Sequence, residues 1–504
     1  MHNISKPTAV AVKILRILAF ILLLISARSH ADVSSLDLPS IGDANASILS
    51  PEYERRLGQA FLGQMRRQAN LVDDTEIENY LRSLGYRLVS HSDNNTQQFT
   101  FFVINEPEIN AFAGPGGIVG VNSGTILSTA NESELASVLA HEIAHVTQKH
   151  VARNFEMQSK MSIPMMAAML GAIILATQNP EAGQAALIAA QGVAAQMQIN
   201  FTRANEEEAD RIGIQTLARS EFNPRGMPAF FEKLQQDSRY QGQAPEFLRS
   251  HPLTTNRIAD TRARAEAFPH DFSYHESADF NYIKAKVMLL TQKNPYDAVK
   301  YFQQRLEEEP YSDEYASLTY GHALALMATG NFDQAEEKLL RLQAAAPENT
   351  SLILARAALE IKRNNYKKAL QIYADARKIF PDYRPIVFSY ARALLEDHQP
   401  EKAKEILRDY GKFLDPDILY YEYLARAEAE SGNMIESGLA SAEYYYLAGE
   451  TILAVDQIQH LLMSRNPKPD YYLRERLQDR LVFMERELKI EKDMKLHQES
   501  KSRN

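Results

Sequence analysis

Apolar positions recur with the period of an α-helix along most of the chain. The period is clear over residues 51–90 and again over 132–150, so amphipathic helices are expected in both stretches. Between them, residues 99–104 and 118–121 form two strand-like runs, and the turn sequence 114–117 precedes the second run. The pattern predicts a small β-hairpin. Its edge strand could bind an extended peptide, or the hairpin could be purely structural.

A longer period of 34 residues runs through the C-terminal part of the chain. The positions that share it are Gly330, Asn364, His398 and Gly432, and also Ala335, Ala369 and Ala403 with Ser437 in register. This period, with small residues where helices cross, is typical of tetratricopeptide repeats. At least four repeats are expected over 313–465, with an irregular one over 279–310. Such repeats stack into a solenoid whose concave face binds peptides or partner proteins.

The first 31 residues have the pattern of a secretory signal peptide. Basic residues precede an apolar run over 17–25, and small residues occupy positions 29 and 31, the −3 and −1 positions of a cleavage site. An uncleaved membrane anchor is the alternative, but the run is shorter than the ~20 residues that span a bilayer. Cleavage after Ala31 is therefore expected.

Charge and composition narrow the class of protein. Cleavage would remove four positive charges, which takes the formal net charge from −10 to about −14, so nucleic acid is not an expected partner. The 504 residues are too many for one compact core, and 45% hydrophobic with 24% charged residues is ordinary for a soluble protein. The chain has no cysteine, which suits a bacterial periplasm better than a disulfide-rich extracellular setting.

The helical stretch 132–150 contains the sequence His141-Glu142-Ile143-Ala144-His145. Positions four apart share one face of a helix, so both histidines can bind a single metal ion. Glu142 is adjacent, where its carboxylate can hold and deprotonate a water molecule on that metal. A zinc peptidase requires this arrangement. A surface helix with two incidental histidines is the alternative.

A run of acidic residues offers the third metal ligand, 61 residues after His145. Glu206, Glu207 and Glu208 compete for this role, since a carboxylate from a second helix commonly completes a zinc site. Glu206 is favoured because only it has an acidic residue, Asp210, four positions later on the same helix face. Asp210 can then accept a hydrogen bond from a ligating histidine. A solvated acidic face is the alternative.

A methionine- and alanine-rich segment lies between these two motifs. Its apolar portion, residues 161–176, is about 15 residues long, which is short for a transmembrane helix. Methionine clusters form adaptable hydrophobic surfaces. Two interpretations stay open: a buried packing helix, or a mobile flap that makes peripheral contact with a membrane or an unfolded client through 161–176.

The assembled motifs resemble the HtpX-like and CAAX-prenyl-endopeptidase family of gluzincin metallopeptidases. The likeness rests on residues 110–113 with Gly116 and Gly117, on 141–145, on 206–210, and on 250–253 followed by Arg257 and Ile258. These motifs follow one another in the family order over about 50–270. No transmembrane helix is expected beyond the signal, so a prenylated substrate is not expected.

The resemblance implies one Zn²⁺ per subunit, bound by His141, His145 and Glu206. It implies that Glu142 is the general base and that Asp210 orients a ligand. It also places His251 near the metal, where this residue either stabilises the tetrahedral oxyanion or occupies the open coordination site of the idle enzyme. Arg257 is a further group that could offset charge on that oxygen.

The expected fold is mainly α. An α+β zincin-type metallopeptidase domain with a small β-sheet spans 32–275, and an α-solenoid of tetratricopeptide repeats spans 276–490. A signal peptide, 1–31, precedes them, and a charged tail, 491–504, follows.

The resemblance implies a periplasmic zinc-dependent endopeptidase of a Gram-negative bacterium. It would degrade misfolded or stalled outer-membrane β-barrel proteins and assist their assembly by a chaperone-like action. Its repeats would bind the outer-membrane β-barrel assembly machinery. The alternative is a repeat-based chaperone or scaffold in which proteolysis is suppressed.

Overall fold

The structure is a computed structural model that describes residues 51–93, 98–154, 156–157, 180–241, 245–269, 276–412, 417–465 and 468–502. The predicted signal peptide, residues 32–50 and the apolar segment 161–176 lie outside the described residues. The described residues are mostly helical, with strands in one small sheet, which confirms the predicted fold class. No helix in these ranges is both long enough and apolar enough to cross a membrane.

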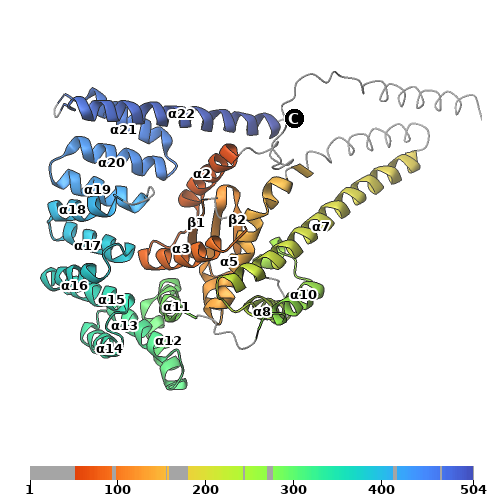
Figure 1. The fold of residues 1–504 in the computed structure, drawn as a ribbon, viewed down its shortest axis with the longest axis horizontal. Coiled ribbons are helices and arrows are strands. Elements are labelled where there is room, and N and C mark those ends of the chain that lie inside the picture. The colour runs from red at the N-terminus through yellow and green to blue at the C-terminus, as the bar shows by residue number, and fades with distance from the viewer. Residues whose placement is uncertain are drawn as a thin grey trace, which may run out of the picture. The chain divides into compact units, whose positions relative to one another are not determined.

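The N-terminal part combines a small sheet with helices that cover it (Figure 1). Its elements are α2 (Pro51–Gln68), α3 (Thr75–Ser90), β1 (Thr100–Ile104), β2 (Ala111–Gly114), the 3-10 turn η1 (Pro115–Gly117), β3 (Ile118–Asn122), α4 (Ser123–Ser128), α5 (Glu132–Thr147), α7 (Pro180–Arg219), α8 (Gly226–Gln241), α9 (Glu246–Ser250) and α10 (Thr255–Glu266). One hydrophobic core, which includes Leu81, Val121 and Leu139, joins α3, the sheet and α5. The sheet thus rests against the helix that carries the two histidines.

The sheet is mixed, and its central strand is β3. It pairs in parallel with β1 and antiparallel with β2. The predicted hairpin of 99–104 with 118–121 is therefore wrong in its pairing. A tight turn can join only antiparallel strands, and η1 joins β2 to β3. Gly116 and Gly117 reverse the chain there with φ values of 72° and 78°.

Helix α5 has a defined beginning and end. Asn131 caps its N-terminus by accepting a hydrogen bond from the backbone N–H of Glu134. The helix ends at Thr147, three residues before the predicted end, because Lys149 adopts a positive φ of 55°. This left-handed residue redirects the chain four residues after His145.

Helix α7 packs very closely against α5 at Gly213. A Cβ atom at this position would lie 3.3 Å from both the carbonyl carbon of Ala140 and the amide nitrogen of His141. Ala144 and Ala209 are buried together nearby. Small residues on both helices therefore allow the acidic run of α7 to reach the histidines of α5.

The C-terminal part is a stack of helix pairs in chain order (Figure 1). The helices are α11 (Ala278–Thr291), α12 (Pro295–Glu308), α13 (Tyr315–Ala328), α14 (Phe332–Ala345), α15 (Thr350–Lys362), α16 (Tyr366–Ile379), α17 (Arg384–Glu396), α18 (Pro400–Tyr410), α19 (Ile418–Glu430), α20 (Met434–Leu447), α21 (Thr451–Met463) and α22 (Tyr471–Ser502). The predicted repeats are confirmed, and most of the predicted tail continues the helix α22.

The 34-residue period has a backbone cause. Gly330, Asn364, His398 and Gly432 each stand between the two helices of a pair, and each has a positive φ, of 81°, 58°, 54° and 80°. Glycine and asparagine adopt this conformation most readily. The period therefore marks the sharp turn that closes each helical hairpin.

The repeats contact α3 through partly buried ion pairs. Lys286 of α11 lies 2.7 Å from Glu76 and 2.9 Å from Asp74, and Arg384 of α17 lies 3.1 Å from Glu78. The described residues belong to one compact unit. The domain boundary near 275 stays a prediction, because contacts of this kind cross it.

Candidate metal centre

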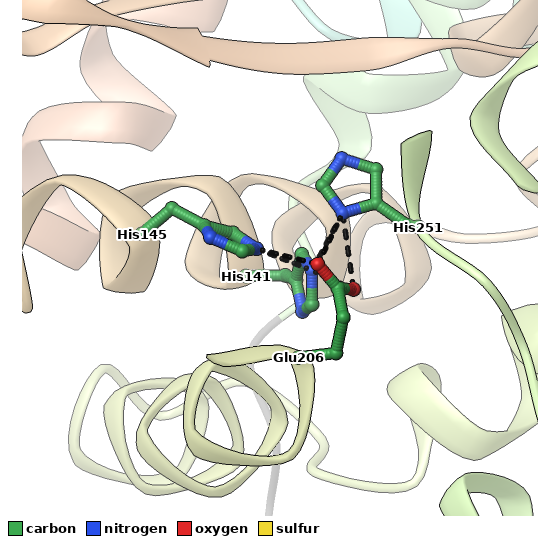
Figure 2. A group of neighbouring side chains, drawn as sticks. All are labelled: His141, His145, Glu206 and His251. Carbon is green, nitrogen blue, oxygen red and sulfur yellow. Dashed lines mark hydrogen bonds and ion pairs between the residues drawn. The ribbon is translucent and has the colours of Figure 1, made fainter. Parts of the chain in front are cut away.

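Four side chains from three separate elements converge at one point (Figure 2). His141 and His145 come from α5, Glu206 comes from α7, and His251 directly follows α9. One ligand atom from each residue lies within 4.8 Å of the others, and all four residues are buried or nearly so. The structure thus brings together the three predicted zinc ligands and the predicted nearby histidine.

The spacing of these atoms fits a zinc ion. Nε2 of His141 lies 3.0 Å from Nε2 of His145 and 3.3 Å from Nδ1 of His251. The carboxylate of Glu206 lies 3.4 Å from each of the two histidines of α5 and 3.1 Å from Nδ1 of His251. Bonds of ~2.0–2.1 Å to a tetrahedral zinc place its ligand atoms about 3.3–3.4 Å apart. The donor set, three imidazoles and one carboxylate, is also one that zinc prefers.

The other two glutamates of the acidic run are outside this group. Glu207 is exposed, and Glu208 pairs with Arg153 at 2.7 Å. Of the three candidates for the third ligand, Glu206 is the one that reaches His141 and His145.

Asp210 lies on the far side of His141. Its Oδ1 is 3.0 Å from Nδ1 of that ring, and Arg257 donates two hydrogen bonds, of 2.7 and 2.8 Å, to its carboxylate. Nη1 of Arg257 also lies 3.0 Å from Glu206 and donates to the carbonyl of Pro252. The guanidinium of Arg257 is thus held by Asp210, Glu206 and Pro252, and its role at a reacting oxygen stays a prediction.

Glu142 is completely buried beside the group. Nε2 of His251 lies 3.5 Å from its Oε1, and the backbone N–H of Ala113 approaches the carboxylate without a well-aligned hydrogen bond. Burial raises the pKa of Glu142, against the opposing pull of His251 and His141. A buried carboxylate that lacks strong partners is able to accept and release a proton.

Charge in the group is distributed unevenly. Burial alone would lower the pKa of His141, but Asp210 and Glu206 outweigh it and raise this pKa to about 10. Burial, together with the nearby His141, holds the pKa of His145 well below its usual range. Burial opposes ionisation of Glu206, yet His141 and His251 hold its pKa far below the ordinary value. The site therefore combines an ionised Glu206 with a neutral His145, and His141 would release its proton on binding a cation.

One neighbour of the group is not evident in the sequence. His150 is buried, and its Nδ1 lies 2.8 Å from Nδ1 of His145. The five-residue spacing is not one that a continuous helix brings into contact. The contact forms because Lys149 has a positive φ, which turns the chain after α5. The sequence does not reveal this backbone angle.

Comparison with known proteins covers both parts of the chain. Residues 76–265 match Peptidase family M48, and residues 360–428 match a tetratricopeptide repeat. The chain is 37% identical over 428 residues to the beta-barrel assembly-enhancing protease of Escherichia coli (strain K12), with 85% of this chain and 86% of that protein covered. The chain belongs to the beta-barrel assembly-enhancing protease family.

Two further relatives agree with this assignment. The putative beta-barrel assembly-enhancing protease of Vibrio cholerae serotype O1 is 36% identical over 408 residues, with 81% of this chain and 84% of that protein covered. The mitochondrial metalloendopeptidase OMA1 of Schizosaccharomyces pombe is 28% identical over 185 residues, with 36% and 50% covered. This member of the beta-barrel assembly-enhancing protease family is accordingly a zinc metalloprotease with tetratricopeptide repeats.

Proposed function

We propose that the protein is a periplasmic endopeptidase that degrades unfolded or misassembled outer-membrane β-barrel proteins. The observation that carries this proposal is the convergence of His141, His145 and Glu206 beside the buried carboxylate of Glu142. In this proposal the first three residues bind zinc, Glu142 is the general base, and Asp210 orients His141.

Bound zinc would supply a Lewis acid that acidifies a water molecule and polarises the peptide carbonyl. Glu142 takes the proton from the attacking water and later delivers it to the leaving amine nitrogen. Its complete burial supports both steps, since a raised pKa lets the carboxylate hold a proton. Asp210 faces Nδ1 of His141 and so keeps Nε2 directed at the group.

The position of His251 supports an inactive resting state of this enzyme. Its Nδ1 lies 3.1 Å from Glu206 and 3.3 Å from His141, so it stands where a fourth ligand stands in a closed site. Its ring also stacks on Phe247 at 4.6 Å. A catalytic zinc site keeps one position open. In this proposal His251 must leave before a substrate can be cut.

The free edge of β2 is suited to bind the substrate. This strand lies at the edge of the sheet, against α5, and its outer side pairs with no described strand. An extended peptide can add to such an edge through main-chain hydrogen bonds, with little demand on sequence. A protease that removes unfolded chains of varied sequence needs recognition of this kind.

The basic and apolar pattern of residues 1–25 supports export to the periplasm, as does the absence of cysteine. The repeats support binding of client proteins and of the outer-membrane β-barrel assembly machinery, because such solenoids are protein-binding modules. The relatives carry a name that refers to β-barrel assembly. The apolar segment 161–176 remains a candidate for peripheral membrane contact.

The decisive experiment is the variant Glu142→Gln in zinc-loaded protein. Loss of the general base should reduce casein cleavage by ~10²–10⁴-fold while zinc content stays unchanged. Glu246→Gln, which alters an exposed glutamate of α9, is the matched control and should cleave at the normal rate. Normal cleavage by Glu142→Gln would refute the assigned role.

Two further measurements test the substrate and the alternative function. A urea-unfolded β-barrel protein should be cut much faster than the same protein folded in detergent. If Glu142→Gln restores every phenotype of a deletion strain, the protein acts as a chaperone or scaffold instead. Crosslinking from the repeats in intact cells should capture outer-membrane proteins or their assembly machinery, and failure to capture either contradicts the proposed partners.

A further inference from the structure

His150 returns to the metal group after the end of α5. The positive φ of Lys149, 55°, turns the chain so that the ring of His150 meets the ring of His145 edge to face, with centroids 4.8 Å apart. The two Nδ1 atoms are 2.8 Å apart, and His150 is only 4% exposed. This contact is on the side of His145 opposite to Nε2, the atom that faces the other ligand atoms.

The contact continues to a carboxylate of α7. Nε2 of His150 lies 3.1 Å from Oε2 of Glu208, and Arg153 donates a 2.7 Å hydrogen bond to the same oxygen. Glu208 stands two positions after the proposed ligand Glu206. A chain of polar contacts therefore runs from His145 through His150 and Glu208 to Arg153.

The direction of each hydrogen bond in this chain follows from the ligand role of His145. Its Nε2 needs a lone pair to bind a metal, so its proton must be on Nδ1. That proton can be donated only to an acceptor, and Nδ1 of His150 must then be unprotonated. The remaining proton of His150 is on Nε2, where the carboxylate of Glu208 accepts it. Every ring nitrogen in the chain thus has one role that agrees with the distances.

The second ligating histidine is supported in a parallel way. His141 faces Asp210, and Arg257 donates to Asp210 at 2.7 and 2.8 Å. Each ligating histidine of α5 is therefore linked to a carboxylate of α7 that is itself held by an arginine. The link from His145 differs in having a second imidazole between the ligand and the carboxylate.

We infer that His150 and Glu208 are positioning residues for the zinc ligand His145, which they hold in the correct tautomer and orientation. This inference rests on the proposed metal site. It also assigns a purpose to the acidic run, in which Glu206 binds the metal while Glu208 and Asp210 orient the two histidines. Partners of this kind typically contribute ~10–100-fold to metal affinity.

The test is the zinc affinity of the full chain, measured by competition with a chelator. His150→Leu removes the acceptor for His145 and should weaken zinc binding by ~10–100-fold. His150→Asn keeps an oxygen acceptor close to the position of Nδ1 and should recover most of that loss. Glu207→Gln, at an exposed neighbour of Glu208, is the matched control and should bind zinc normally.

A spectroscopic measurement separates positioning from loss of folding. Because the chain has no cysteine, the visible absorption of the Co²⁺-loaded protein reports nitrogen and oxygen ligands alone. His150→Leu should shift these bands, and Glu207→Gln should leave them unchanged. If His150→Leu does not fold, Glu208→Gln takes its place, with an expected loss of zinc affinity of ~10–100-fold.

The outcomes distinguish this inference from the proposed function. Normal zinc affinity and normal Co²⁺ bands in both His150→Leu and Glu208→Gln would overturn the inference while the metal site stands. A wild-type protein that binds no stoichiometric zinc would overturn the proposed function itself. Weaker zinc binding by His150→Leu, with recovery in His150→Asn, supports both the inference and the proposed metal site.

Discussion

Nδ1 of His141 lies 3.0 Å from Oδ1 of Asp210, on the side of the ring that faces away from the other ligand atoms. Burial of Asp210 would raise its pKa, but hydrogen bonds from Arg257 and the nearby His141 hold that pKa below the usual value. The carboxylate therefore stays ionised and fixes the ring through one strong contact.

Replacement of this carboxylate should weaken metal binding. Asp210→Asn removes the charge and leaves the buried guanidinium of Arg257 without its main partner, so zinc affinity should fall by ~10–100-fold. Chelator competition measures the change. Asp260→Asn, in an exposed pair with Arg264, is the control and should have normal affinity. Equal zinc affinity in wild type and Asp210→Asn would contradict this role.

Removal of the His251 ring should activate the protease. If His251 occupies the open position at rest, His251→Ala should raise casein cleavage by ~10-fold. This is the expected gain when the fraction of molecules able to cleave rises from about a tenth to nearly one. His460→Ala, at an exposed histidine of α21, should leave the rate unchanged. A fall in the rate with zinc retained would instead assign His251 to stabilisation of the oxyanion.

Features governed by local geometry could be predicted from the sequence. His141 and His145 share a helix face because they are four residues apart, and the structure places their Nε2 atoms 3.0 Å apart. The repeat period was visible because one position in each repeat needs a left-handed backbone, and glycine or asparagine fills three of the four turns.

Features governed by distant parts of the chain could not be predicted in this way. The pairing of β1 with β3 depends on the path of the residues between them, which the strand pattern does not encode. The place of Arg257 in a motif suggests a role in the reaction but does not reveal its partners Asp210 and Glu206, which come from another helix. His150 depends on a left-handed lysine, a residue type that rarely signals such a turn.

The close approach of α5 and α7 predicts opposite effects for two glycines of α7. Gly213→Ala would force its methyl group against the backbone of Ala140 and His141, so the free energy of unfolding should fall by ~1–3 kcal/mol. Zinc affinity should fall as well, because the helix spacing sets the distance from Glu206 to the histidines. Gly192→Ala has open space around it and should raise stability by up to ~1 kcal/mol. Urea unfolding and zinc titration of both variants check this prediction. If the two substitutions change stability and zinc affinity equally, a steric clash at Gly213 is excluded.

The ion pair between α3 and the repeats predicts a pH dependence of stability. Burial raises the pKa of Glu78 from 4.5 to about 7, although Arg384 opposes this. Below pH 4.5 the carboxyl is neutral in both the folded and the unfolded chain, so its ionisation costs nothing. As the pH rises from 4.5 to 7, the unfolded chain loses this proton first, and the folded state becomes less stable. Above pH 7 the loss of stability is complete and no longer changes with pH.

Glu78→Gln should abolish this dependence. Between pH 4.5 and pH 8, the free energy of unfolding of the variant minus that of wild type should increase by ~1–3 kcal/mol. This range is below the full effect of the pKa shift, because the side chain of Glu78 is 30% exposed to solvent. Urea unfolding at pH 4.5, 6 and 8 measures the difference, with Glu337→Gln at an exposed site of α14 as the control. The lost contact with Arg384 adds an offset that changes little with pH, so the trend is the diagnostic quantity. A stability difference that stays constant over this range would mean that Glu78 titrates as it does in an unfolded chain.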